Sequence, residues 1–185
     1  MSGVNTDYSL SGIMADIDLG PTGSLQMMFA KLQLAQSQIC KNQAEDYMSQ
    51  IEEIQEEQKK CAEMIEQARD LQQQGKNGEG VGQKSVNGVT TTGKDCAPMS
   101  QELITFMEQR GLSFPNSDND FILGEEEWDY TLKSLTNYQE QIGNKTQTLL
   151  IYLQDFIGQY NSYQQGASSA ISEANQTLSN IARGQ

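Results

Sequence analysis

Residues 128–181 read WDYTLKSLTNYQEQIGNKTQTLLIYLQDFIGQYNSYQQGASSAISEANQTLSNI and carry an almost unbroken seven-residue repeat. The repeat positions, alternately four and three residues apart, are Trp128, Leu132, Leu135, Gln139, Ile142, Thr146, Leu149, Leu153, Phe156, Tyr160, Tyr163, Ala167, Ala170, Ala174, Thr177 and Ile181. This spacing is typical of a helix that keeps one face against a partner helix. Such a helix would be about 80 Å long, too long for one compact core. We expect it to pack against another long helix, from this molecule or from copies of it.

A second apolar line runs beside this seam. Leu150, Ile157, Ile171 and Leu178 are spaced in sevens, with Gln164 filling the gap. Across the same 54 residues there are only four acidic and two basic side chains. One apolar stripe serves one partner, whereas two adjacent stripes with few charges indicate several neighbours. Because ordering each backbone residue costs about 1–2 kcal/mol, a single seam would leave this helix marginal.

A first long helix is predicted over residues 25–74, with Ser24 as its N-cap. Its apolar positions are Met28, Leu32, Ala35, Ile39, Tyr47, Ile51, Ile54, Gln58, Cys61, Ile65 and Ala68. The step from Ile39 to Tyr47 is eight residues, which predicts a local shift of the packing face. Residues 45–70 carry nine acids against three bases, a run typical of a solvated helix face.

Residues 75–127 form an insert between the two predicted helices. Gly75 is expected to stop the first helix, and residues 75–95 predict either a mobile loop or a weak hairpin that turns at Asn87-Gly88. Ser100 should cap a short helix that ends at Gly111. Its apolar side consists of Leu103, Ile104, Phe106 and Met107. Residues 121–123 either form a brief strand or dock on this helix, and Glu125, Glu126 and Glu127 suit the positive end of the last helix.

The composition excludes several classes of protein. A formal net charge of −13 over 185 residues argues against binding nucleic acid or anionic membranes. The longest apolar runs are far shorter than the roughly 18 residues of a membrane span, so we expect no membrane insertion. Residues 1–24 hold no basic side chain, and we expect no Sec signal peptide there. They predict either a disordered tail or an uncleaved export segment.

No catalytic, cofactor-binding or metal site is predicted. The chain has no histidine, so the commonest general base and zinc ligand are missing. Its three cysteines are an odd number. Cys40 and Cys61 lie on one predicted helix about 30 Å apart, and Cys96 is expected in a loop. We interpret all three as free thiols and the chain as a non-enzyme.

The predicted fold is all-α. Two long helices form an antiparallel coiled-coil hairpin, with a small irregular insert containing one short helix and, as an open alternative, a short hairpin. The expected segments are residues 1–24, 25–74, 75–127 and 128–183. The residues expected to form the coiled coil and the self-assembly surface are Met28, Leu32, Ile39, Tyr47, Ile51, Ile54, Ile65, Leu135, Ile142, Leu149, Leu150, Leu153, Phe156, Ile157, Tyr160, Tyr163, Ile171 and Leu178.

This order of segments resembles the EspA/SseB-type filament proteins of bacterial type III secretion systems. The resemblance is carried by the polar N-terminus before Ser24-Leu25-Gln26-Met27-Met28-Phe29-Ala30 and by the long first helix. It is also carried by the segment Ala97-Pro98-Met99-Ser100-Gln101-Glu102-Leu103-Ile104-Thr105-Phe106-Met107. A long Gln/Ser/Thr-rich terminal helix completes it, so that it covers residues 25–183. The cysteines in the first helix and the long glycine-rich loop depart from the pattern.

The resemblance implies a secreted structural subunit that self-assembles into a hollow extracellular filament. Such a filament extends the secretion needle and conducts effectors to the host cell. Its implied partners are copies of itself, needle or tip proteins, pore-forming translocators and, before export, a dedicated small helical chaperone. Two alternatives stay open at this point. One is a needle-tip protein that forms a discrete small oligomer, and the other is a cytosolic coiled-coil scaffold or chaperone.

Overall fold

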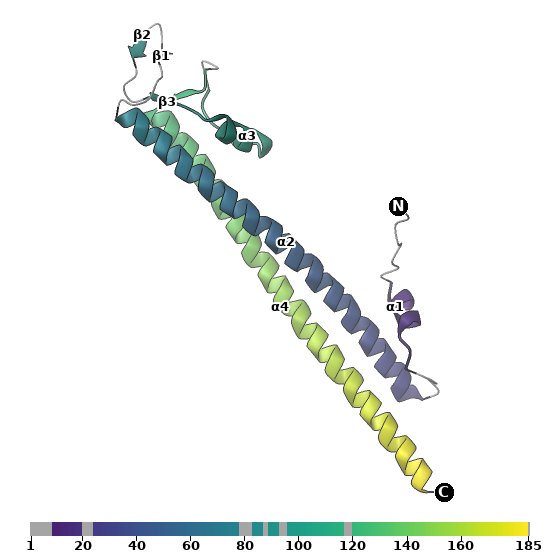
Figure 1. Ribbon diagram of the computed structural model, residues 1–185. Coiled ribbons are helices and arrows are strands. Elements are labelled where there is room, and N and C mark those ends of the chain that lie inside the picture. Colours follow the sequence, from purple (N-terminus) through teal and green to yellow (C-terminus); the bar gives the residue numbers. More distant parts are fainter. Residues whose placement is uncertain are drawn as a thin grey trace. The chain divides into compact units, whose positions relative to one another are not determined.

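The computed structural model describes residues 9–19, 24–77, 83–86, 89–92, 96–116 and 120–184, without the side chains of 83–86 and 89–92. Over these residues the chain is mostly helical, and a long pair of helices packs together in a coiled-coil-like manner (Figure 1). The elements in chain order are α1 (Leu10–Asp16), α2 (Leu25–Lys76), β1 (Gln83–Val86), β2 (Val89–Thr92), β3 (Cys96–Pro98), α3 (Gln101–Gln109), β4 (Ile122–Gly124) and α4 (Glu125–Arg183).

The chain divides into two compact units, and both contain part of α2 and part of α4. The terminal unit comprises residues 1–51 and 148–185, and the insert unit comprises residues 52–147. Within each unit, rising residue numbers on α2 meet falling numbers on α4. In the terminal unit Ser37 meets Gln164 and Cys40 meets Gln159. The two segments of each unit therefore run in opposite directions.

The insert unit contains the short helix that the sequence predicts. The side chain of Ser100 accepts a hydrogen bond from the backbone N–H of Leu103, which caps α3 at its N-terminus. Gly111 has a φ of +64°, and the N–H of Leu112 donates to the carbonyl of Met107 at 2.9 Å, which closes the helix C-terminus. The four predicted apolar residues of α3 are all buried. The prediction of this helix and of both its ends is confirmed.

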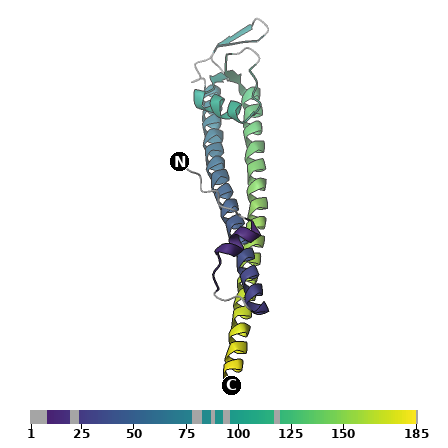
Figure 2. The ribbon, with the colours of Figure 1, turned by 90° about the vertical axis from the view of Figure 1, so that its right-hand side faces the viewer.

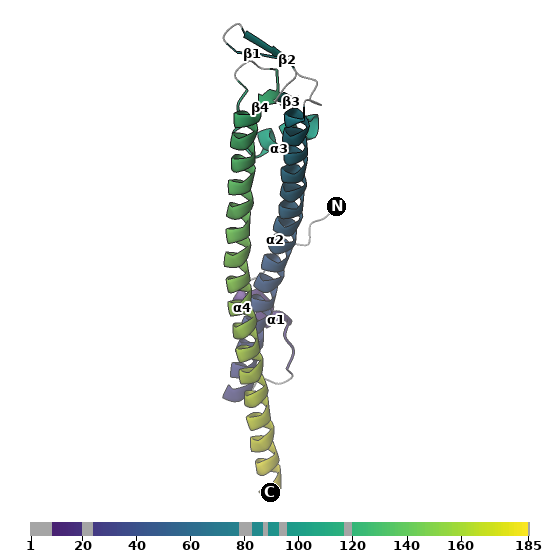
Figure 3. The ribbon, with the colours of Figure 1, turned by 90° about the vertical axis from the view of Figure 1, so that its left-hand side faces the viewer.

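Around α3 the insert differs from the sequence expectation in two places. Cys96 was expected in a loop, but it belongs to β3, which pairs antiparallel with β4 (Figure 3). Gly75 was expected to stop the first helix, but α2 continues to Lys76. A side chain at position 75 would come within 3.1 Å of the Cys96 backbone. This glycine is therefore used for a close approach of β3 rather than for a helix end.

The hairpin alternative for the glycine-rich segment agrees with the structure. Strands β1 and β2 pair antiparallel, with Val86 opposite Val89. The turn expected at Asn87-Gly88 lies outside the described residues. At the other end of the insert, residues 125–127 form the first turn of α4, where their carboxylates face the positive end of the helix dipole.

The seam of α4 follows the predicted repeat over most of its length. From Trp128 to Ala174 every repeat position is buried or half-buried. Thr177 and Ile181 are exposed. Thr131, which is not part of the repeat, is also fully buried, and its hydroxyl donates to the carbonyl of Glu127.

On α2 the predicted seam is wrong between residues 28 and 39. The face that meets α4 follows an unbroken repeat, and all its members are buried or half-buried: Ala30, Gln33, Ser37, Cys40, Ala44, Tyr47, Ile51, Ile54, Gln58, Cys61, Ile65, Ala68, Gln72 and Gly75. The one-residue slip after Ile39 is therefore absent. The error arose because the larger apolar residues were assigned to the seam, whereas small ones face α4 and Met28 is 57% exposed.

The larger residues at the start of α2 lie near a helix that the sequence did not predict. Residues 1–24 were expected to be a disordered tail or an export segment, but residues 10–16 form α1, with Ser9 as its N-cap. Figures 1 and 2 show α1 beside the first part of α2. Met14 and Ala15 of α1 line one cavity with Met28 and Leu32 of α2. This helix is short and weakly apolar, which is why its periodicity gave no signal.

Candidate interaction surface

The terminal unit exposes a band of large apolar side chains on α4. Three of the four residues of the second line are exposed: Leu150 by 41%, Ile157 by 45% and Leu178 by 62%. Ile171, the fourth, is half-buried. We call these four residues the exposed stripe. Beside it, Ile151 is 63% exposed and Tyr152 is 48% exposed. Leu150, Ile151, Tyr152 and Ile157 lie within about two turns of α4, and clustered exposed apolar side chains mark interaction sites in soluble proteins.

The predicted interaction residues fall into three groups by burial. The buried ones are Ile51, Ile54, Ile65, Leu135, Ile142 and Leu149. The half-buried ones are Leu32, Ile39, Tyr47, Leu153, Phe156, Tyr160, Tyr163 and Ile171. The exposed ones are Met28, Leu150, Ile157 and Leu178. The buried group packs inside the helix pair, so only the exposed group offers its side chains fully to another molecule.

Aromatic residues hold the two helices together within the terminal unit. Tyr47 stacks on Phe156 with 5.5 Å between ring centroids, and it also meets Tyr152 at 5.8 Å. Such ring pairs contribute about 0.5–1.5 kcal/mol beyond the area they bury. Phe156 is therefore a residue of the α2·α4 packing, and a substitution there would affect the monomer first.

Sequence reasoning missed a second exposed apolar region, at the start of α2. Leu25 is 80% exposed and Phe29 is 48% exposed, next to Met28. With α1 they line a cavity of about 560 Å³, whose residues are Met14, Ala15, Leu25, Met28, Phe29, Lys31 and Leu32. We call this cavity the α1/α2 groove. The signal that could have found it is the cluster Met27-Met28-Phe29, which is larger than one helix seam requires.

In the insert unit, a network of polar side chains fastens the end of α3 to both long helices. The guanidinium of Arg110 donates to both carboxylate oxygens of Glu57, with 2.7 Å between Nη2 and Oε2. The Tyr138 hydroxyl donates to the same carboxylate at 2.7 Å. Arg110 also lies 3.8 Å from the centroid of the Phe106 ring. The bidentate pair and the cation–π contact fix α3 in one position.

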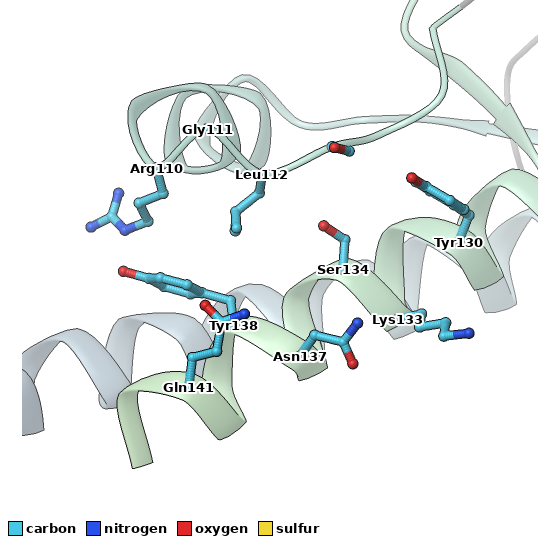
Figure 4. Close-up of a pocket in the computed structure, with 10 residues that line it drawn as sticks. Arg110, Gly111, Leu112, Tyr130, Lys133, Ser134, Asn137, Tyr138 and Gln141 are labelled. Atoms are coloured by element: carbon cyan, nitrogen blue, oxygen red, sulfur yellow. The ribbon is translucent and has the colours of Figure 1, made fainter. Parts of the chain in front are cut away.

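A polar cleft of about 530 Å³ lies next to this network (Figure 4). Arg110 and Leu112 stand on one side, and Tyr130, Ser134 and Tyr138 of α4 stand on the other. The remaining lining residues are Gly111, Ser113, Lys133, Asn137 and Gln141. The lining residues that the structure describes include no carboxylate, and the Arg110 guanidinium is engaged by Glu57. The described lining of the cleft thus consists mainly of hydrogen-bonding side chains.

The network predicts a specific acid sensitivity of the insert unit. The hydrogen bond from Arg110 lowers the pKa of Glu57 below its ordinary value of 4.5. Because this pKa is lower in the folded state, the stabilisation is present above pH of about 4.5 and is lost as the pH falls through the folded pKa. We expect Glu57→Gln to unfold more easily at neutral pH and to lose less stability than wild type between about pH 6 and pH 3.

Urea unfolding over this pH range, followed by circular dichroism, measures the effect. Glu53→Gln is the matched control, because it removes an exposed carboxylate from the same helix. It should keep the wild-type acid dependence. Identical acid dependence in all three proteins would contradict the role of the Glu57 network.

Cys40, Cys61 and Cys96 are buried, and no disulfide joins them among the described residues. Burial raises the pKa of the Cys61 thiol to about 11 and also raises that of Cys40. Both thiols therefore stay protonated and poorly nucleophilic near neutral pH. Within the described part of the chain, no cluster of three or more Cys, Asp or Glu side chains is arranged to hold a metal ion.

No helix in the described ranges is long and apolar enough to cross a bilayer. No protein-family model, no curated protein and no solved structure matches this chain.

Proposed function

We propose that this protein is a structural subunit that self-assembles into a hollow extracellular filament. In this proposal the filament extends a bacterial type III secretion needle and conducts effectors to the host cell. The observation that carries the proposal is the exposed stripe on α4, where Leu150, Ile157 and Leu178 are 41–62% exposed. The resemblance of residues 25–183 to EspA/SseB-type filament proteins supplies the biological setting.

The physical basis is the number of neighbours that α4 needs. Its seam is covered by α2, while the exposed stripe is a separate line of large apolar residues on the same helix. Burying one such side chain fully contributes about 1.5–3 kcal/mol. Contacts with further copies would therefore gain several times this amount per subunit. A heterologous contact that does not close on itself produces a helical polymer.

The proposal includes a finer fold and a set of partners. The two long helices form one antiparallel coiled-coil hairpin, with residues 75–127 inserted at its distal end. Before export, a small helical chaperone covers the exposed stripe and prevents premature assembly. After secretion, copies of the chain replace the chaperone, and the filament contacts needle or tip proteins and pore-forming translocators. Neither an enzymatic activity nor a cofactor is part of this proposal.

Electron microscopy and sedimentation of the purified protein at neutral pH test the proposal. We expect elongated polymers whose mean size increases with protein concentration, because each added subunit presents the same surface again. A discrete species of a few subunits would instead favour a needle-tip protein. A fully ordered monomer at high concentration would reject self-assembly.

A further inference from the structure

The end of α4 continues past the start of α2 in the terminal unit. Ser37 hydrogen-bonds Gln164 at 2.9 Å, and Gln33 lies against Gly166. This pairing places Leu25, the first residue of α2, opposite about position 175. All residues from 175 to 184 are exposed, whereas Ala174 is 2% exposed. Figures 1 to 3 all show the yellow end of α4 extending past α2. We call residues 175–183 the overhang.

The overhang continues an interface that already exists. Ala170 and Ala174 are buried within the helix pair. Beyond them the seam continues through Thr177 and Ile181, which are exposed, Ile181 by 59%. Leu178 of the neighbouring exposed stripe lies beside them and is 62% exposed. The same packing face thus runs on for about 12 Å without a partner among the described residues. Helical turns in proteins draw most of their stability from such packing, so an additional neighbour would stabilise this end of α4.

The matching surface lies at the start of α2 in the same unit. The α1/α2 groove is open and mostly apolar, and its most exposed residues are Leu25, Met28 and Phe29. Charges of both signs surround the groove, because Lys31 lines it and the acidic Asp16 lies beside it. Asp16, at the end of α1 beside the groove, is exposed, and Arg183 is the one charged residue between Ala174 and Gly184.

We propose that the overhang of one copy docks into the α1/α2 groove of a second copy, with Leu178 and Ile181 packed against Met28 and Phe29. The contact buries the two largest apolar side chains of the overhang and brings Arg183 to the acidic end of α1. It rests on the proposed function in that the partner is another copy of this chain. It differs from that proposal in the surface used: of the exposed stripe only Leu178 belongs to the overhang, whereas Leu150 and Ile157 lie elsewhere on α4 and remain for the lateral contact.

The test mixes two variants that are each defective in one half of the contact. Leu178→Asp places a charge on the overhang, and Phe29→Asp places one in the groove. Both are made in a background carrying Leu150→Asp and Ile157→Asp, so that lateral association does not obscure the result. Analytical ultracentrifugation measures the oligomeric state, and circular dichroism confirms that the helices are intact.

We expect each variant alone to associate at least tenfold more weakly than the background protein. An equimolar mixture should form a 1:1 dimer, because one copy keeps its overhang and the other keeps its groove. Asn180→Asp is the control, since it adds the same charge about 200° away from Leu178 on the same helical turn. It should associate like the background.

A mixture that stays monomeric would overturn the docking contact between copies. The partner of the overhang would then have to be a different protein. Wild-type association in Leu178→Asp alone would overturn it as well. If Phe29→Asp fails to fold, Leu25→Asp replaces it, because that side chain is 80% exposed. Failure of the proposed function is recognised by a different result, obtained with wild type and with Leu150→Asp/Ile157→Asp. In that case wild type forms no long polymer, or Leu150→Asp/Ile157→Asp polymerises like wild type.

Discussion

Replacing both Leu150 and Ile157 with aspartate is expected to remove long polymers while leaving the helix content unchanged. Both side chains are already substantially exposed, so the charges cost little in the monomer. In a contact between copies they would lose water without gaining a partner, which costs several kcal/mol per charge. Electron microscopy should show no extended filament, and sedimentation should show only short species.

A matched control separates this effect from a general effect of added charge. Ser162→Asp/Ser169→Asp also places two aspartates seven residues apart at exposed positions of α4, but on a different side of the helix. It should polymerise like wild type. Filaments of normal length from Leu150→Asp/Ile157→Asp would contradict the role of the exposed stripe. Substitutions at Leu153 or Phe156 make a weaker test, because Phe156 stacks on Tyr47 inside the helix pair.

Trp128→Ala is expected to cause the largest loss of stability of any single substitution considered. Trp128 is 1% exposed and belongs to the fully buried side chains of the insert unit, together with Leu103, Met107 and Leu123. Removing a buried aromatic side chain typically costs about 3–5 kcal/mol, because the cavity collapses only in part. Chemical denaturation followed by circular dichroism at 222 nm should show a correspondingly lower midpoint.

Two variants make this prediction specific. Trp128→Phe should cost much less, since it keeps an aromatic ring and removes a buried Nε1 that has no hydrogen-bond partner in the described structure. Tyr130→Ala, two residues further on and 53% exposed, should change the free energy of unfolding by less than about 1 kcal/mol. Equal losses for Trp128→Ala and Tyr130→Ala would contradict the placement of the core.

Features with strong local signals could be predicted from the sequence. The seam of α4 could be predicted because large apolar residues repeat over many turns. The burial of the repeat positions from Trp128 to Ala174 agrees with this prediction. Helix α3 was readable because Ser100 and Gly111 mark its ends. In both cases the local pattern and the packing favour the same structure.

The start of α2 could not be predicted in the same way. Two faces of this segment are apolar, and the face with the larger residues, Met28 and Ile39, was assigned to the seam. The structure places the smaller residues Ala30, Ser37 and Cys40 against α4. Periodicity alone does not distinguish a face that meets a partner helix from one that lines a groove. The α1/α2 groove was missed for this reason and because α1 is only seven residues long.

The small residues of this seam have a mechanical consequence. The buried seam residues of the terminal unit include Ala30, Ser37, Ala167 and Ala170, so the layers there remove little apolar surface from water. Trp128, Leu135 and Ile65 of the insert unit remove much more. Separating the methyl-lined layers costs less free energy, so local opening of the native state should begin there. The terminal turns of such a subunit can separate and pack against new neighbours, while the residues around Trp128 stay packed.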